Sequence, residues 1–249
     1  ANNVINSTHI LHFTLPPEPG KYPTVIHLIG GIMKSFKASD EDEDVLYAHG
    51  YIPEAVTQRI PAPPDGIRVC IAASKVYSYY CGYTPFSHGI TFQSAVIHGV
   101  ARVIEYTGTT SQCKAMVGED EHLEEEKLWA LHNIVGGMFG GDERWKDTRL
   151  PFKNEEVKRV FVLRVDIDRN ASEVHSRQGI FGLEAGWEYS DSGDNYWEGA
   201  IPIWETYGDL IKGNTGIDQS PQYLVDLFDK RKGDNKAVAE EEAKKPYQP

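Results

Sequence analysis

The stretch that most constrains the fold spans residues 84–106 and is rich in Val, Ile, Phe and Ala after a turn-like Pro-Phe-Ser-His segment. Such a run is typical of a strand half-buried in the wall of a barrel. His88, Phe92 and Gln93 stand near its start, where an apolar strand presents polar groups to a cavity. The alternative is a hydrogen-bonded loop histidine beside an ordinary polar strand residue. We expect this strand to be the ligand-facing element.

Short apolar segments before this stretch predict further strands, at residues 9–13, 24–32, 45–50 and 67–73. The first two are joined by a proline-rich segment that cannot continue a hydrogen-bonded ladder, so they are expected to form a hairpin. The next segment is aromatic and carries Tyr77, Tyr79, Tyr80 and Tyr83. These tyrosines either pack along a barrel seam with their hydroxyls in water or line a pocket.

The second half of the chain predicts an amphipathic helix over residues 124–135, ended by the glycine pairs that follow it. A short helix at Asn154, strands at 160–167 and 199–205 and a helix at 221–229 are also expected. Strands dominate, so the predicted class is mainly β, an antiparallel barrel with appended helices. We expect one domain over residues 1–229 and a charged, disordered tail over 230–249.

The charge balance argues against two classes of partner. The 249 residues carry a formal net charge of −12, with an isoelectric point near 5.2. Nucleic acids and anionic membranes require a basic face, so neither is expected as a partner. Cys70, Cys81 and Cys113 show neither a disulfide framework nor the spacing of a zinc site. We expect a cytoplasmic protein with no metal site, and no segment reaches transmembrane length.

Several sequence blocks occur in a fixed order along the chain. They are Leu46-Tyr47-Ala48-His49-Gly50, residues 69–75, 84–88, 92–99 and 126–131, Arg144-Trp145 and Ile201-Pro202-Ile203-Trp204-Glu205. This order resembles the fungal branch of the flavin-nucleotide-binding proteins, in the pyridoxamine-phosphate-oxidase-like FMN-binding split-barrel superfamily. The resemblance covers roughly residues 4–207 and implies a split β-barrel that assembles as a homodimer. It also implies kinship with FMN-dependent oxidases and nitroimidazole reductases.

Two departures from the family pattern concern the FMN phosphate. The family's Ser-Ser-Arg after His-Gly is replaced by Pro53-Glu54-Ala55, and the Tyr-Arg-Ser of the central strand by Phe92-Gln93-Ser94. Proline has no amide hydrogen to donate, and a glutamate repels a phosphate dianion. Two lost contacts of ~1.5–3 kcal/mol each weaken FMN binding by ~10²–10⁴-fold. The alternatives are that the family pattern aligns one residue away, or that Lys75, Arg59 or Arg68 supplies the phosphate contact.

The sequence therefore favours a flavin-independent enzyme on a lipophilic small molecule, a cyclase or isomerase whose reaction is of the pericyclic, Diels–Alder-like type. No cofactor is expected, with FMN as the alternative. An FMN-dependent oxidoreductase and a non-catalytic binding protein remain the alternative functions. The expected catalytic donors are His88, Gln93, His49, Tyr80 and Tyr83, and the expected substrate-binding walls are Tyr47, Tyr77, Tyr79, Phe92 and Trp204.

Overall fold

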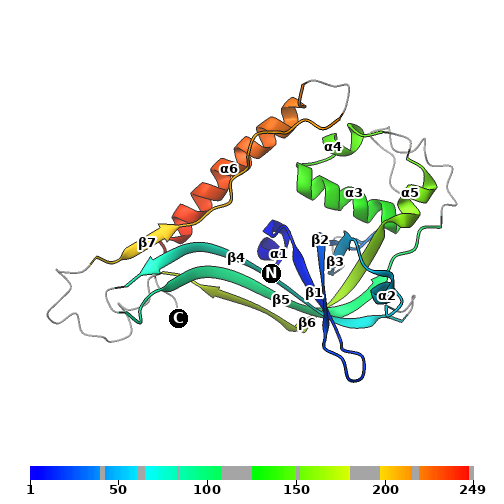
Figure 1. Ribbon diagram of the computed structural model, residues 1–249, viewed down its shortest axis with the longest axis horizontal. Coiled ribbons are helices and arrows are strands. Elements are labelled where there is room, and N and C mark those ends of the chain that lie inside the picture. The colour runs from blue at the N-terminus through cyan, green and yellow to red at the C-terminus, as the bar shows by residue number, and fades with distance from the viewer. Residues whose placement is uncertain are drawn as a thin grey trace. The chain divides into compact units, whose positions relative to one another are not determined.

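The computed structural model describes residues 1–39, 43–60, 65–82, 85–107, 125–149, 152–179, 197–214 and 219–246. The chain divides into two compact units. The first contains Ala1–Ala73 and Ala95–Val174, and the second contains Ser74–Ser94 and His175–Pro249. Strands β4 and β5 pass through both units, and Figure 1 shows every element in chain order by colour.

The first unit is built on a ring of six strands in the order β1-β2-β3-β6-β5-β4, closed by pairing of β1 with β4. Phe13 of β1 lies opposite Ile26 of β2 on one side and Ile71 of β4 on the other, both in antiparallel register. The mainly antiparallel barrel class is therefore confirmed. The strands are β1 (Leu11–Leu15), β2 (Thr24–Lys34), β3 (Asp44–Gly50), β4 (Ile67–Cys81), β5 (Gly89–Val103) and β6 (Phe161–Arg177).

Alternation along the strands places one apolar set inside this ring. In β1, Leu11, Phe13 and Leu15 are buried while His12 is exposed, because successive strand residues point to opposite faces. Burial of an apolar side chain of this size contributes about 1.5–3 kcal/mol, so the pattern fixes which face is inside. The interior cluster also contains Leu28, Leu46, Ile71, Ile97, Leu163 and Val165.

A short helix, α1 (Asn2–Ser7), precedes β1 and packs against β2, with Val4 and Ile5 buried in the core. The Asn6 amide nitrogen donates to the Ile32 carbonyl at 2.9 Å, and its oxygen accepts from the Ile32 amide at 2.7 Å. Strand β1 pairs only with residues 24–28 of β2. Ile32 lies beyond that pairing, so it has β3 on one side and Asn6 on the other.

Helix α3 (Glu126–Phe139) packs on the outer face of β2 and β3, where its Leu128, Leu131 and Ile134 form a second apolar cluster with Tyr47. The helix is longer than predicted: Gly136 and Gly137 lie inside it, and it ends at Gly140, whose φ of 80° suits a residue without a Cβ. The other short helices of this unit are α2 (Glu54–Thr57), α4 (Glu143–Lys146) and α5 (Asn154–Arg159).

The second unit contains the adjoining ends of β4 and β5, strand β7 (Gly199–Pro202) and helix α6 (Gln222–Glu242). Strand β7 pairs antiparallel with β4, with Ile201 opposite Tyr79. The expected disordered tail from residue 230 differs from the structure, because α6 continues to Glu242 and buries Ala239. Alanine, glutamate and lysine are strong helix formers, which accounts for a helix in so charged a segment. No described helix combines the length and apolarity needed to cross a bilayer.

Candidate functional site

The residues expected to line the barrel mouth fall in several different environments. His88, between β4 and β5 in the sequence, is exposed, as is the nearby Phe86. Phe92 and Gln93 are half-buried on β5, whereas Tyr79 on β4 is exposed. Tyr83 lies outside the described residues. The roles assigned to these side chains from the sequence stay predictions.

Two polar pairs join β4 to β5 within the second unit. The Tyr77 hydroxyl donates to the Gln93 side-chain oxygen at 3.4 Å, so the structure brings two of the predicted residues together. The neighbouring Ser78 and Thr91 hydroxyls are buried and lie 2.7 Å apart. Burial raises the pKa of Tyr77, and the Glu242 carboxylate acts in the same direction. Tyr77 is therefore a hydrogen-bond donor at neutral pH.

Tyr80 is also buried in this unit, with the Arg177 guanidinium 5.2 Å from the centre of its ring. Its hydroxyl packs so closely on Gly89 that a Cβ there would lie 2.5 Å from the oxygen. Trp204 is partly exposed, and the Lys236 ammonium of α6 lies 5.7 Å from its ring centre. Such contacts hold Tyr80 and Trp204 as packed side chains.

The two remaining predicted residues lie on β3 in the first unit. His49 is half-buried, and burial lowers its pKa, so its imidazole is neutral at pH 7. Tyr47 has no exposed surface and belongs to the cluster beneath α3. Its ring meets the Trp129 ring edge-on, with centroids 5.4 Å apart. Tyr47 is therefore not a wall of an open pocket.

A charged cleft of about 420 Å³ lies near Tyr47, in the volume range of small-molecule sites. The end of β5 and the residues after it form one part of its lining, and the start of α3 and Arg164 of β6 form the rest. The lining side chains include two arginines and three glutamates. The full lining is Arg102, Val103, Ile104, Glu105, Thr107, Glu125, Glu126 and Arg164.

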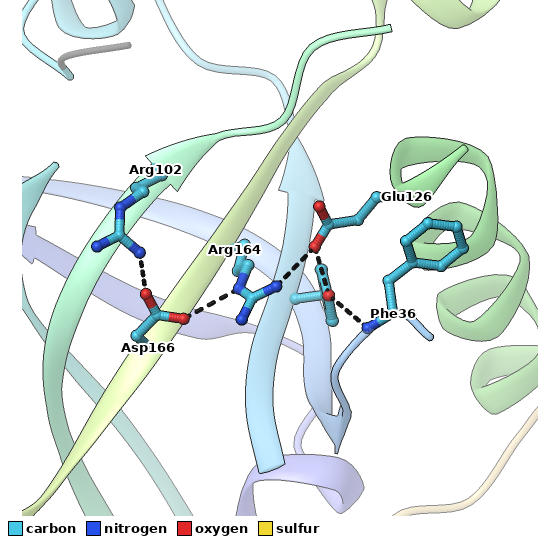
Figure 2. Close-up of polar contacts among 6 residues, drawn as sticks. Phe36, Arg102, Glu126, Arg164 and Asp166 are labelled. Carbon is cyan, nitrogen blue, oxygen red and sulfur yellow. Dashed lines mark hydrogen bonds and ion pairs between the residues drawn. The ribbon is translucent and has the colours of Figure 1, made fainter. Parts of the chain in front are cut away.

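A chain of ion pairs runs along this cleft (Figure 2). Arg102 pairs with the Asp166 carboxylate, whose other oxygen accepts from Arg164 Nε at 2.9 Å. Arg164 Nη1 donates to Glu126 Oε1 at 3.1 Å, and the buried Tyr47 hydroxyl donates to the same oxygen at 2.6 Å. Both of these contacts fall on Oε1, so they fix the Glu126 carboxylate by one oxygen.

Burial changes the pKa of two side chains at or beside the cleft, Tyr47 and Lys127. Burial, followed by the hydrogen bond to Glu126, raises the pKa of Tyr47 to about 12, so its hydroxyl stays protonated. The Phe36 amide donates to that hydroxyl oxygen at 3.1 Å, which completes its hydrogen bonding. Burial also lowers the pKa of Lys127, and Glu105 of the cleft opposes that effect.

Sequence reasoning missed the four charged members of this chain, Arg102, Glu126, Arg164 and Asp166. Charged residues inside a strand such as β6 could have indicated an ion-pair cluster. A half-buried strand carries charged side chains chiefly where each charge has a partner of opposite sign. The pattern does not show that β6 lies between β3 and β5, and that neighbourhood is what brings Arg164 to Glu126.

The residues at which the sequence predicts a lost phosphate anchor lie on α2 and beside it. Pro53 precedes α2 and Glu54 begins it, and the Glu54 carboxylate accepts from Gln58 at 3.2 Å. Arg59, a suggested substitute, pairs with Glu18 at 3.3 Å and donates to Thr24 at 2.7 Å. A carboxylate at position 54 and a guanidinium already paired at position 59 do not favour binding of a phosphate there.

Comparison with solved structures identifies the architecture. The chain superposes on the flavocytochrome Anf3 from Azotobacter vinelandii with a TM-score of 0.63 and 16% identity, over 90% of this chain and 86% of that one. It superposes on an FAD and heme binding protein from Mycobacterium smegmatis with a TM-score of 0.60 and 14% identity, over 91% and 93%. This chain has a split-barrel fold. At such identities the similarity of the split barrels concerns the fold alone. No protein-family model matches the sequence, and no curated protein matches it.

Proposed function

We propose that this split-barrel protein is a cytoplasmic, flavin-independent isomerase or cyclase that acts on a small polar carbonyl compound in the charged cleft. The observation that carries the proposal is the Glu126 carboxylate, held by Tyr47 and Arg164 at the wall of a ligand-sized cleft. A fixed carboxylate beside guanidinium groups is suited to moving a proton from carbon while the developing oxyanion is stabilised.

In this mechanism Glu126 is the base and Arg164 binds the substrate oxygen. Glu126 takes a proton from the carbon next to the carbonyl. The electron pair of that C–H bond forms a C=C bond while the carbonyl π pair moves onto oxygen, which gives an enolate. Arg164 pairs through Nε and Nη1, and a guanidinium has five N–H donors, so Nη2 can donate to that oxygen while Arg102 adds positive charge. In an α-hydroxycarbonyl or a conjugated unsaturated carbonyl compound, Glu126 returns the proton to another carbon of the delocalised enolate, which gives an isomer. Attack of the enolate carbon on a second carbonyl carbon of the same molecule gives a ring, as the π pair of that carbonyl moves onto its oxygen and the oxygen takes the proton from Glu126.

The role of Tyr47 is to position the base. Its hydroxyl remains a donor because its pKa is raised to about 12, and it binds Glu126 from the buried side. The lining charges favour a polar substrate over the lipophilic one expected from the sequence. A pericyclic reaction depends mainly on a pocket that holds the reactive conformer, whereas a fixed carboxylate beside guanidinium groups supports proton transfer directly.

Deuterium exchange tests the proposal while the physiological substrate is still unidentified. A panel of small enolisable keto acids and keto esters, incubated with the protein in D₂O, should show enzyme-dependent loss of the α-proton signal by NMR. Glu126→Gln keeps an oxygen for the Tyr47 hydroxyl but removes the base, so exchange should fall by about 10²–10⁴-fold.

Glu155→Gln, an exposed change on α5, is the matched control and should keep wild-type exchange. Unchanged exchange in Glu126→Gln would contradict the assignment of the base. Loss of exchange in His88→Ala or Gln93→Ala, with Glu126→Gln unaffected, would instead place the reaction at the residues predicted from the sequence.

An FMN-dependent oxidoreductase of the fungal flavin-nucleotide-binding branch is the second candidate, favoured by the similarity to a flavocytochrome and to an FAD and heme binding protein. Purified protein that is yellow and releases about one flavin per chain on denaturation would establish it. The combined variant Pro53→Ser, Glu54→Ser, Ala55→Arg and Gln93→Arg should raise FMN affinity if only the phosphate contacts differ, which calorimetry would measure.

A further inference from the structure

A pair of histidines lies on the outer face of the barrel, on two strands that contribute nothing to the lining of the charged cleft. His12 of β1 and His27 of β2 are direct cross-strand partners, and both are exposed. Their ring centroids are 5.0 Å apart, with an angle of 80° between the ring planes. We propose that His12 and His27 form a surface site for a divalent transition-metal ion of the Zn²⁺, Ni²⁺ and Cu²⁺ class.

The spacing of the two rings matches chelation of a single ion. Two imidazoles that bind one ion at ~2.0–2.1 Å, with an angle of ~90–110° at the metal, have ring centroids roughly 4.5–5.3 Å apart. The observed 5.0 Å lies in this interval. Only rotation about the side-chain bonds is then needed to direct one nitrogen of each ring at the ion.

The backbone holds both histidines in place before any ion binds. Strand β1 is paired on both sides, since His12 lies opposite His27 on one side and Ala72 of β4 on the other. The residues on either side of His12 and His27 in sequence are buried inside the barrel: Leu11, Phe13, Ile26 and Leu28. Folding therefore already holds the two ligands together, so ion binding requires little further loss of backbone conformational entropy.

The surroundings of the pair determine which ions fit. The cross-strand neighbours on the same face, Thr14, Val25 and Ala72, carry no charge, so no cation opposes binding among them. Imidazole suits Zn²⁺, Ni²⁺ and Cu²⁺, whereas Mg²⁺ and Ca²⁺ require oxygen ligands. Within the described ranges, no third histidine, cysteine or carboxylate completes a larger group, so water fills the remaining positions.

An edge-to-face aromatic contact between two imidazoles is the competing explanation of the same geometry. The two explanations differ in their consequences, because only the metal site binds an ion added to the protein. An ion on His12 and His27 also ties β1 to β2, so it should raise the melting temperature as its occupancy increases.

Calorimetric titration of EDTA-treated protein with ZnCl₂, and separately with NiCl₂ and MgCl₂, tests the site. We expect one Zn²⁺ or Ni²⁺ per chain and no heat of binding with Mg²⁺. His12→Ala and His27→Ala should each weaken Zn²⁺ binding by roughly tenfold or more, because one ligand remains. Lowering the pH to 5 should also weaken binding, since protons compete for the imidazole nitrogens.

His175→Ala removes another exposed histidine, on β6, and should keep the wild-type affinity. The exchange of His27 with Val25 on the same face, His27→Val with Val25→His, keeps the composition but moves the ring opposite Thr14, so Zn²⁺ binding should weaken to about the level of the single alanine variants. His12→Gln and His27→Gln replace any alanine variant that fails to fold. Wild-type affinity in both single variants, or no Zn²⁺ binding by the native protein at millimolar concentration, would overturn the proposal.

Discussion

Removal of the Tyr47 hydroxyl should destabilise the protein in a way that depends on pH. The hydroxyl is fully buried, donates to Glu126 at 2.6 Å and accepts from the Phe36 amide at 3.1 Å. Tyr47→Phe keeps the ring that packs on Trp129 and removes only the oxygen. The change therefore isolates the hydrogen bonds from the apolar contacts.

The lost hydrogen bonds give the size of the effect. A hydrogen bond to a charged group contributes about 1.5–3 kcal/mol, and the variant also leaves the Phe36 amide without its partner. Burial is the largest cause that raises the pKa of Tyr47 to about 12, so this donor is protonated at neutral pH. We expect a loss of about 3 kcal/mol in the free energy of unfolding, which lowers Tm by roughly 6–12 °C.

The sign of the pH dependence follows from the direction of the pKa change. Because the folded-state pKa of Tyr47 lies above its unfolded value, its contribution is fully present below pH ~10. The contribution is lost as pH rises through about 12. The difference in unfolding free energy between the native protein and Tyr47→Phe should therefore be constant from pH 7 to 9 and nearly vanish by pH 12.

Urea unfolding followed by circular dichroism at pH 7, 9, 10.5 and 12 measures this difference. Tyr51→Phe is the control, since Tyr51 is exposed and its loss should change stability by less than ~0.5 kcal/mol at every pH. A stability gap for Tyr47→Phe that persists undiminished at pH 12 would refute the account of a protonated donor to Glu126.

Other predictions follow from backbone contacts, burial and assembly. Gly99→Ala should cost about 1–3 kcal/mol in urea unfolding, because its Cβ would lie 2.4 Å from the Asp166 carbonyl oxygen, whereas Gly137→Ala in α3 meets nothing within 4 Å and should gain ~0.5–1 kcal/mol. Since burial lowers the pKa of His49, stability should fall as pH drops below ~6.5, and His49→Gln should reduce that fall. Light scattering should give a homodimer near twice 27.9 kDa, and a monomer at micromolar concentration would contradict it.

Strand β1 and the first half of β2 were predictable because burial alternates there, whereas β3 was predictable as a short apolar run, with Val45, Leu46, Tyr47 and Ala48 all buried. The sequence also suggested a break between residues 73 and 76, yet β4 runs unbroken from Ile67 to Cys81. Exposed Ser74 and half-buried Lys75 interrupt the apolar pattern there, but the strand continues through them. The polarity of a side chain indicates whether it faces water and does not indicate whether its backbone is hydrogen-bonded to a neighbouring strand.

The charged cleft was not predictable by the same route. Glu126 begins a helix, Arg164 lies within β6 and Arg102 lies near the end of β5. These residues are far apart in the sequence, so their position around one cleft could not be predicted from it. Strand order in the ring is decided by long-range pairing, which no local pattern records. Tyr47 illustrates the limit: the sequence suggested a substrate-binding wall, but the partner of its hydroxyl lies 79 positions away.

The Asn6 side chain has a consequence for self-association. Its amide occupies the N–H and C=O of Ile32 beyond the end of β1, where a neighbouring strand would otherwise pair. Unpaired backbone groups at a sheet edge are templates for strand addition by another molecule, and proteins protect such edges. Asn6 of α1 thus hydrogen-bonds the edge of β2 at a position that the five-residue strand β1 does not reach. This contact protects that position of β2 against pairing with a strand of another molecule.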